Sequence, residues 1–229
     1  MNAIFTEETK TGDIIIKFPA ASKLFKEYKI DFCCGGNRPI GEAIKSLHLE
    51  DKDLVKVLNI MYEQMQTTEE IDWMNRSLTD LVKYIIDHYH ANTRDLLEEL
   101  DGFVSKVYRV HGERDLHLKD MYTQFYLLKD DLEQHLLREE QRIFPKVIEY
   151  EASKEVESLE MARAEIAILE KEHEGAGEIL KKIRQATNDY ELPLHACNTY
   201  RLTYLKLEEL ESLTFDHIHL ENNVLFRRL

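Results

Sequence analysis

The chain has 229 residues, more than one average domain and less than two, since a domain typically spans about 100–200 residues. Its eight glycines and four prolines make up about 5% of the sequence, against about 12% in an average protein, which disfavours a turn-rich all-β fold. The 44 acidic and 30 basic residues give a net charge of −14, which argues against binding of nucleic acid or of an anionic membrane surface.

The sequence begins without the features of a secreted protein. Residues 1–18 lack the basic start, apolar run and small-residue cleavage site of a secretory signal. No apolar stretch approaches the roughly 18–20 residues of a membrane span. The three cysteines include two adjacent ones, which is no disulfide framework. We therefore expect a soluble, cytoplasmic protein.

Residues 1–66 form a first, small helical domain in this interpretation. They hold most of the clusters that break regular structure, among them Thr11-Gly12-Asp13 and Cys34-Gly35-Gly36-Asn37. So short a segment buries little apolar area, so we expect it to dock on the larger domain or on a partner. Between the breaks the sequence predicts helices near residues 20–28, 40–47 and 51–64.

Cys33 and Cys34 stand immediately before two glycines, which permit a positive φ, so we expect a tight, exposed turn. Adjacent cysteines lie about 3.8 Å apart at Cα, too close for an unstrained disulfide. A strained pair suits a transient thiol role, such as receiving iron or exchanging with a partner thiol. The alternative is a pair of small apolar residues buried in a turn.

Residues 67–74 are polar and acidic at their start, and we interpret them as a linker. From residue 75 to 229 the apolar residues recur at spacings of three and four, which is typical of helices with one buried face. Short connections between long amphipathic helices favour antiparallel neighbours, so we predict an all-α, up-down four-helix bundle. The predicted breaks lie near His111-Gly112, after Phe144-Pro145 and around residues 188–193, and the four apolar stripes run over residues 82–107, 121–143, 159–183 and 210–224.

Each stripe is interrupted by one histidine that must face the core. In two stripes a glutamate follows four residues later, which places both side chains on one helix face. A rise of about 1.5 Å per residue puts these residues at similar depth, whereas His111 lies about 30 Å beyond the first of them and is left out of the predicted site. The predicted set is His90, His135, Glu139, His173, His217 and Glu221.

Four imidazoles and two carboxylates in one core layer are costly to bury unless they are paired with one another or bind metal. Four nitrogen donors and two potentially bridging carboxylates suit a pair of transition ions better than Mg²⁺ or Ca²⁺. Iron, manganese and zinc all fit by ligand type, with iron preferred. The alternative is a structural network of histidines hydrogen-bonded to glutamates. The ferritin-like class needs paired Glu-x-x-His motifs, and only Glu170 with His173 matches one.

The order of these motifs resembles the hemerythrin-like di-iron bundle and, more narrowly, the repair-of-iron-centres family of the ScdA and YtfE type. The resemblance covers nearly the whole chain. The matching segments are Asp31-Phe32-Cys33-Cys34-Gly35-Gly36, Tyr89-His90, Val110-His111-Gly112, His135-Leu136-Leu137-Arg138-Glu139-Glu140-Gln141, Phe144-Pro145, Glu172-His173 and His217-Ile218-His219-Leu220-Glu221-Asn222-Asn223-Val224-Leu225-Phe226.

The resemblance implies two non-haem iron ions, oxo- and carboxylate-bridged, held by the four histidines with Glu139 and Glu221 as bridges. It implies a protein that repairs iron–sulfur clusters damaged by nitric oxide or oxidants through donation of iron, with damaged iron–sulfur proteins as partners and Cys33 and Cys34 available for iron transfer. Two alternatives stay open: reduction of nitric oxide to nitrous oxide at the same site, and a carrier or sensor of O₂ or nitric oxide. A homodimer is a further expectation, because the small first domain needs a covering surface.

Overall fold

The computed structural model describes residues 3–64 and 72–229. Within these ranges the chain is helical, and its only β-type pairing is an isolated bridge between Lys10 and Pro39. Contacts divide the chain into two compact units, one made of Met1–Arg76 with Ile218–Arg228 and the other of Ser77–His217 with Leu229. The last long helix therefore begins in the second unit and ends in the first.

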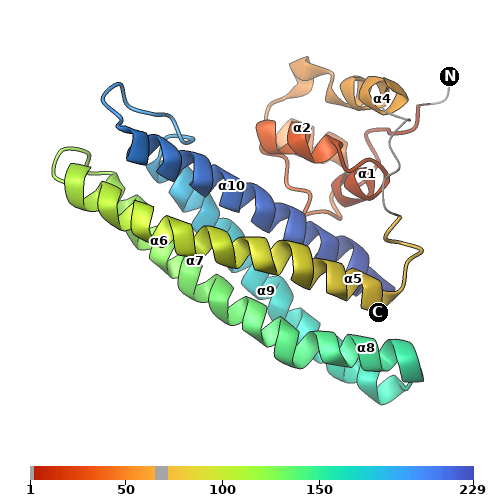
Figure 1. Cartoon of the computed structure of the whole chain (residues 1–229). Helices are drawn as coiled ribbons and strands as arrows, with labels where there is room; N and C mark the ends of the chain where they lie inside the picture. The colour runs from red at the N-terminus through yellow and green to blue at the C-terminus, as the bar shows by residue number, and fades with distance from the viewer. Residues whose placement is uncertain (1–2, 65–71) are drawn as a thin grey trace. The chain divides into compact units, whose positions relative to one another are not determined.

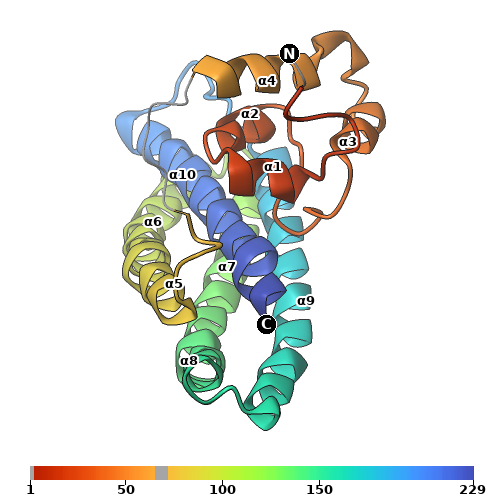
Figure 2. The same ribbon diagram turned by 90° about the vertical axis from the view of Figure 1, so that its right-hand side faces the viewer.

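The N-terminal part of the first unit is a group of short helices joined by loops, the longest of which runs over residues 28–39 (Figure 2). Its core is rich in phenylalanine, including Phe5, Phe18, Phe25 and Phe32, each at most 2% exposed. The predicted linker, residues 67–74, lies mostly outside the described residues. The helices are α1 (Thr11–Lys17), α2 (Ala21–Glu27), α3 (Ile40–Ser46), the 3₁₀ turn η1 (Glu50–Lys52) and α4 (Leu54–Gln64).

The helix α1 contradicts the prediction of a break at Thr11-Gly12-Asp13. Glycine was interpreted as a break because it weakens a helix interior. Here Gly12 is buried in the first turn, and its amide donates to the carbonyl of Gly36 at 2.8 Å. A Cβ at Gly12 would lie 2.6 Å from Oδ1 of Asn223. The glycine is therefore explained by close packing.

The second unit is an up-down bundle in which successive long helices run in opposite directions (Figure 1). Three π-helical segments interrupt or end its long helices. The elements are α5 (Leu78–Tyr84), η2 (Ile85–His90), α6 (Ala91–His111), α7 (Leu118–Arg138), η3 (Glu139–Ile143), α8 (Phe144–Ser153), α9 (Val156–Ala186) and α10 (Asn198–Leu220), continued by η4 (Glu221–Leu225) and η5 (Phe226–Arg228) in the first unit.

The predicted stripes form the core of this bundle. Leu97, Leu100, Val104 and Val107 of α6 are at most 1% exposed, and equivalent stripes of α7, α9 and α10 complete the same cluster. Burial of such side chains contributes about 1.5–3 kcal/mol each relative to leaving them in water. The predicted all-α bundle is confirmed.

The predicted break after Phe144-Pro145 is wrong, because the helix continues as α8 to Ser153. Proline lacks an amide hydrogen and normally disrupts a helix interior. Here α8 begins at Phe144, directly after the π-helical segment η3, so Pro145 lies in the first turn of α8, where an amide donor is not needed.

The start of the bundle is fixed by two side-chain caps on α5. The hydroxyl of Ser77 accepts the amide of Asp80 at 2.9 Å, and the carboxylate of Glu151 from α8 accepts the amide of Thr79 at 2.8 Å. These acceptors satisfy amides that have no partner inside the helix.

No helix of the described residues is long and apolar enough to cross a membrane.

Candidate metal centre

Three of the predicted site residues lie at the ends of the π-helical segments. His90 ends η2, Glu139 begins η3 and Glu221 begins η4. A π-helical turn adds one residue relative to an α-helix, is rare and often occurs at functional sites. Spacings of three and four in the sequence place these three side chains on the inner face of their helices. The π turns change the direction in which the side chains point.

The structure brings all six predicted residues together in two overlapping groups. Every ligand atom in a group lies within 4.8 Å of the others, and every side chain is buried. Both groups contain the same two carboxylates. The first group is His90, Glu139, His217 and Glu221, and the second is His135, Glu139, His173 and Glu221.

Within each group the histidine pair presents its Nε2 atoms to one another. These nitrogens are 3.3 Å apart for His90 and His217 and 3.2 Å apart for His135 and His173. The carboxylate of Glu139 lies between the two pairs, with Oε2 3.3 Å from Nε2 of His90 and Oε1 3.3 Å from Nε2 of His135. One oxygen therefore faces each pair, which is the arrangement of a carboxylate that bridges two cations.

The environment of Glu139 favours a nearby positive charge. The side chain is fully buried, and its oxygens have only imidazole nitrogens nearby, at 3.3 Å, without a well-aligned hydrogen bond. Burial alone would raise the pKa of the Glu139 carboxyl, but the surrounding imidazoles, chiefly that of His135, hold it well below its ordinary value. A buried carboxylate without hydrogen-bond donors is stabilised by cations, so this site fits a pair of metal ions.

The outer nitrogens of two ligands are held by carboxylates that sequence reasoning missed. Nδ1 of His90 lies 2.7 Å from Glu140, which also accepts from Arg94 at 2.8 Å. A carboxylate on one ring nitrogen fixes the tautomer and leaves the other nitrogen free to bind a metal. The pKa of Glu140 is lowered by these two hydrogen bonds, with His90 as the larger cause, although burial opposes the shift.

His135 has a matching arrangement on the opposite side of the centre. Its Nδ1 lies 3.0 Å from Glu172, and Arg138 forms an ion pair with the same carboxylate. The sequence signal is adjacency, because Glu140 follows Glu139 and Glu172 precedes His173. Which carboxylate reaches which ring depends on how the helices pack, so the sequence could not assign these pairs.

Aromatic rings stack on two of the four ligand imidazoles. Tyr89 stacks on His217, with ring centroids 5.7 Å apart and planes 13° apart, and Phe144 stacks on His90 at 5.6 Å. Both contacts limit rotation of the imidazole about its long axis. The sequence predicted a helix break after Phe144-Pro145, so the contact of Phe144 with His90 was not predicted.

The cysteine turn lies in the first unit and differs from the expected exposed turn. Cys33 is only 6% exposed, Cys34 is partly buried, and their sulfur atoms are 3.8 Å apart as free thiols. The expected positive φ is absent, because no glycine of the described residues has one. Instead, Asp31 accepts the amides of Cys33 at 3.0 Å and Gly35 at 2.9 Å.

The turn is also hydrogen-bonded to the end of the last helix within the same unit. The side-chain amide of Asn223 donates to the carbonyls of Phe32 at 3.1 Å and Cys33 at 3.0 Å. His219 contacts the carbonyl of Phe32 at 3.1 Å through Nδ1. Gly36 lies against the same asparagine, and a Cβ there would lie 2.4 Å from its Oδ1.

His111 belongs to a separate cluster. Its Nε2 lies 3.4 Å from the sulfur of Cys197, and its Nδ1 lies 3.2 Å from the guanidinium of Arg114. Among the described residues it belongs to neither of the two groups that could hold a metal ion.

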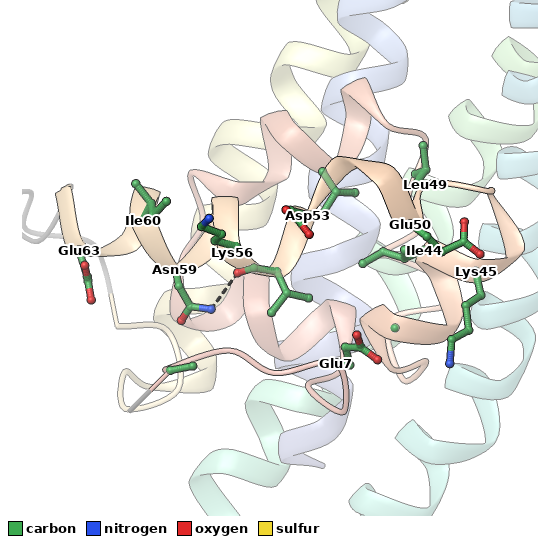
Figure 3. A pocket seen from close by; sticks show the side chains of 14 residues that line it. Glu7, Ile44, Lys45, Leu49, Glu50, Asp53, Lys56, Asn59, Ile60 and Glu63 are labelled. Atoms are coloured by element: carbon green, nitrogen blue, oxygen red, sulfur yellow. Dashed lines mark hydrogen bonds between the residues drawn. The ribbon is translucent and has the colours of Figure 1, made fainter. Parts of the chain in front are cut away.

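A groove in the first unit is lined by residues of α3, η1 and α4 and by the N-terminal segment before α1 (Figure 3). Its lining combines apolar side chains with both acidic and basic ones, such as Glu7 and Lys45. None of the six predicted ligands lines it. The groove therefore shares no residue with the two groups of described residues that could hold a metal ion.

Comparison with known proteins assigns both parts of the chain. Residues 81–229 match the hemerythrin HHE cation binding domain, and residues 7–62 match ScdA_N, a domain of unknown function (DUF542). The iron–sulfur cluster repair protein YtfE of Yersinia pseudotuberculosis serotype IB (strain PB1/+) is 35% identical over 95% of this chain and 94% of its own length. That of Yersinia pestis (strain Pestoides F) has the same identity and coverage. The chain belongs to the family of hemerythrin-type proteins with an ScdA_N domain that includes these YtfE proteins.

Proposed function

We propose that this protein holds two non-haem iron ions in its bundle and donates iron to damaged iron–sulfur clusters. The observation that carries the proposal is Glu139, a buried carboxylate whose two oxygens face two different histidine pairs. The names of the related YtfE proteins supply the biological context, since each is an iron–sulfur cluster repair protein. The same proposal places the protein in the cytoplasm.

The ligand set accepts iron, manganese and zinc, and the names of the related iron–sulfur cluster repair proteins favour iron. One ion would be held by His90 and His217 and the other by His135 and His173, with Glu139 and Glu221 shared. Two imidazoles and two shared carboxylates leave room at each ion for a bridging oxygen and for one small molecule. Such a pair can store electrons, and iron is released more readily in its ferrous form, because the lower charge weakens its bonds to anionic ligands.

We assign Cys33 and Cys34 as transient acceptors of the donated iron. Two free sulfurs 3.8 Å apart can bind one ion together. The hydrogen bond with Cys34, followed by burial, raises the pKa of Cys33 well above its usual range, so this thiol stays protonated at neutral pH. Iron binding must then displace a proton, which makes capture reversible and suits transfer better than storage.

The test is reactivation of a dehydratase whose [4Fe–4S] cluster has lost an iron. Iron-loaded protein should restore activity faster than an equal amount of free ferrous iron under anaerobic conditions. The Glu139→Gln variant mixed with the same free iron is the control, because it should lack the bridge. Equal recovery with wild-type protein, variant and free iron would contradict iron donation.

A second candidate function is reduction of nitric oxide, which the shared position of Glu139 between two groups favours. Two molecules of nitric oxide, two electrons and two protons yield one nitrous oxide and one water. Two ferrous ions side by side hold the two electrons required. Single-turnover gas analysis of the reduced protein should then detect one nitrous oxide per iron pair. Stable, reversible binding of O₂ or nitric oxide without loss of iron would favour a carrier or sensor.

Damaged iron–sulfur proteins are the proposed partners, and a homodimer stays a prediction. Sedimentation of the full chain would measure its oligomeric state. The acidic surface gives no reason to include nucleic acid or a membrane among the partners.

A further inference from the structure

The two halves of the metal centre are built differently, and this difference bears on which ion leaves first. The inference rests on the proposed function, because it concerns release of the iron that would be donated. The first half is defined here as His90 with His217, and the second half as His135 with His173. Both halves share Glu139, so any difference between them must come from the histidines and from what holds them.

The histidines of the first half lie on separate helices, and both depend on the end of η2. His90 ends η2 before α6, and its outer nitrogen is held by Glu140 of η3. His217 lies on α10 and is stacked on Tyr89. Tyr89 precedes His90 in η2, so local opening of η2 removes the ligand His90 and, at the same time, the ring that is stacked on His217.

Both histidines of the second half depend on one turn of α9. His173 lies on that turn, and the preceding residue, Glu172, holds Nδ1 of His135 at 3.0 Å. Opening of this turn removes a ligand and, at the same time, the carboxylate that orients the other ligand. Each half therefore has one turn that carries a ligand together with the side chain that supports the other ligand: the end of η2 in the first half and this turn of α9 in the second.

The same turn is weakened by two glycines that packing does not require. Gly175 and Gly177 follow His173 inside α9, where glycine lowers helix stability relative to alanine. A Cβ built at either position would meet nothing within 4 Å, so neither residue permits a close approach of another element. The two glycines therefore soften the helix beside the ligand without improving its packing.

Solvent reaches the supports of both halves to a similar extent. The ion pair of Glu172 and Arg138 beside His135 is about one third exposed, and in the pair beside His90 Glu140 is 25% and Arg94 44% exposed. Among the four ligand histidines, His135 is the most exposed, at 6%.

We propose that the second half is the labile half of the centre, and that the ion held by His135 and His173 is released before the other through opening of α9 at Glu172–Gly177. The ion held by His90 and His217 stays behind and leaves more slowly.

The experiment measures release and not activity. Protein loaded anaerobically with two ferrous ions is mixed with an excess of a colour-forming ferrous chelator, and absorbance is followed in time. Two phases of one iron each are expected. Gly175→Ala with Gly177→Ala should slow the fast phase on the order of fivefold. Gly102→Ala is the matched control, since Gly102 is also a helical glycine with nothing within 4 Å of an added Cβ.

A second pair of variants identifies the half that empties first. Glu172→Gln should accelerate the fast phase, and Glu140→Gln should accelerate only the slow phase. If Glu172→Gln is isolated with one iron while Glu140→Gln keeps two, the inference is also supported, because the labile ion was lost during purification. Circular dichroism establishes that each variant is folded.

Three outcomes would overturn the inference. Release of both ions in one phase, acceleration of the fast phase by Glu140→Gln instead of Glu172→Gln, or equal slowing by Gly102→Ala and the double variant would each do so. Because the chelator reports release alone, two-phase release without repair of a damaged cluster would contradict the proposed function and leave this inference standing.

Discussion

Glu139 shows how a single residue can require a cofactor. Its carboxylate is fully buried, stays ionised because imidazoles lower its pKa, and accepts no hydrogen bond from a neutral donor. A buried negative charge without such donors costs several kcal/mol unless a cation balances it. The sequence alone places Glu139 on the inner face, and the structure adds that its two oxygens face different histidine pairs.

Replacement of Glu139 by glutamine should remove the bridge without unfolding the bundle. Glutamine has the same shape but only one oxygen that can bind a cation and no negative charge. We expect the iron content to fall from about two ions per chain to fewer than one, as measured by elemental analysis after anaerobic loading. Glu133→Gln, an exposed position on α7, is the control and should keep both ions. Retention of two ions by the Glu139 variant would remove this residue from the bridge.

Gly36 should tolerate no side chain, for reasons of packing. An added Cβ would lie 2.4 Å from Oδ1 of Asn223 and 2.8 Å from the carbonyl of Phe32, and the carbonyl belongs to the backbone. Gly36→Ala should therefore destabilise the first unit by roughly 1–3 kcal/mol. Hydrogen exchange of the amides around the cysteine turn measures the effect, with Gly102→Ala as the unstrained control. Unchanged protection in Gly36→Ala would show that the turn shifts freely.

At the scale of elements, the spacing of apolar residues predicts the long helices. It fails for helices whose formation depends on a packing partner or on the adjoining segment. The stripes of α6, α7, α9 and α10 could be predicted, because a buried helix face leaves a regular spacing. The helix α1 was missed, because Gly12 was interpreted without knowledge of the asparagine packed against it. The helix α8 was missed, because the π segment that accommodates Pro145 has no signature in sequence.

The cap on α5 gives an element-scale prediction with a definite pH dependence. Hydrogen bonds from Thr79, through its hydroxyl and its amide, lower the pKa of Glu151 despite partial burial, which opposes the shift. A lowered pKa in the folded protein means that the carboxylate stabilises the fold above its ordinary pKa of about 4.3 and loses this contribution as pH falls further. Glu151→Gln should cost about 1 kcal/mol at pH 7.

Thermal unfolding of the metal-free wild-type protein and the Glu151 variant measures this contribution. The difference in melting temperature should be largest near pH 7 and should shrink as the pH is lowered from 5 towards 3. Comparing two metal-free proteins removes the separate effect of acid on metal binding. A difference that stays constant over this range would contradict a charged cap.

At the scale of the whole molecule, the sequence predicts the fold of the bundle and the six residues of the centre. It does not predict the side chains that hold those six residues in place. Helical spacing and depth bring the histidines and glutamates to one level without any knowledge of packing angles. The outer carboxylates, the stacked rings and the hydrogen bonds of Asn223 depend on contacts between helices. Sequence spacing along one helix carries no information on such contacts.

Iron should stabilise the folded chain as a whole. A ligand that binds only the folded state adds about 2.7 kcal/mol when its free concentration is one hundred times its Kd. We therefore expect the iron-loaded protein to unfold at a higher temperature than the metal-free protein in scanning calorimetry. The Glu139→Gln variant should show little of this gain. An equal gain in the variant would point to iron bound elsewhere on the chain.

The end of the last helix belongs to the first unit, and this has a consequence for biosynthesis. The first unit combines Met1–Arg76 with Ile218–Arg228, so it is complete only after about 150 further residues have been added to the chain. At about 5–20 residues per second this takes roughly 8–30 seconds. During that interval the carbonyls of Phe32 and Cys33 lack the amide of Asn223. The cysteine turn of the nascent chain therefore gains these two hydrogen bonds only near the end of translation.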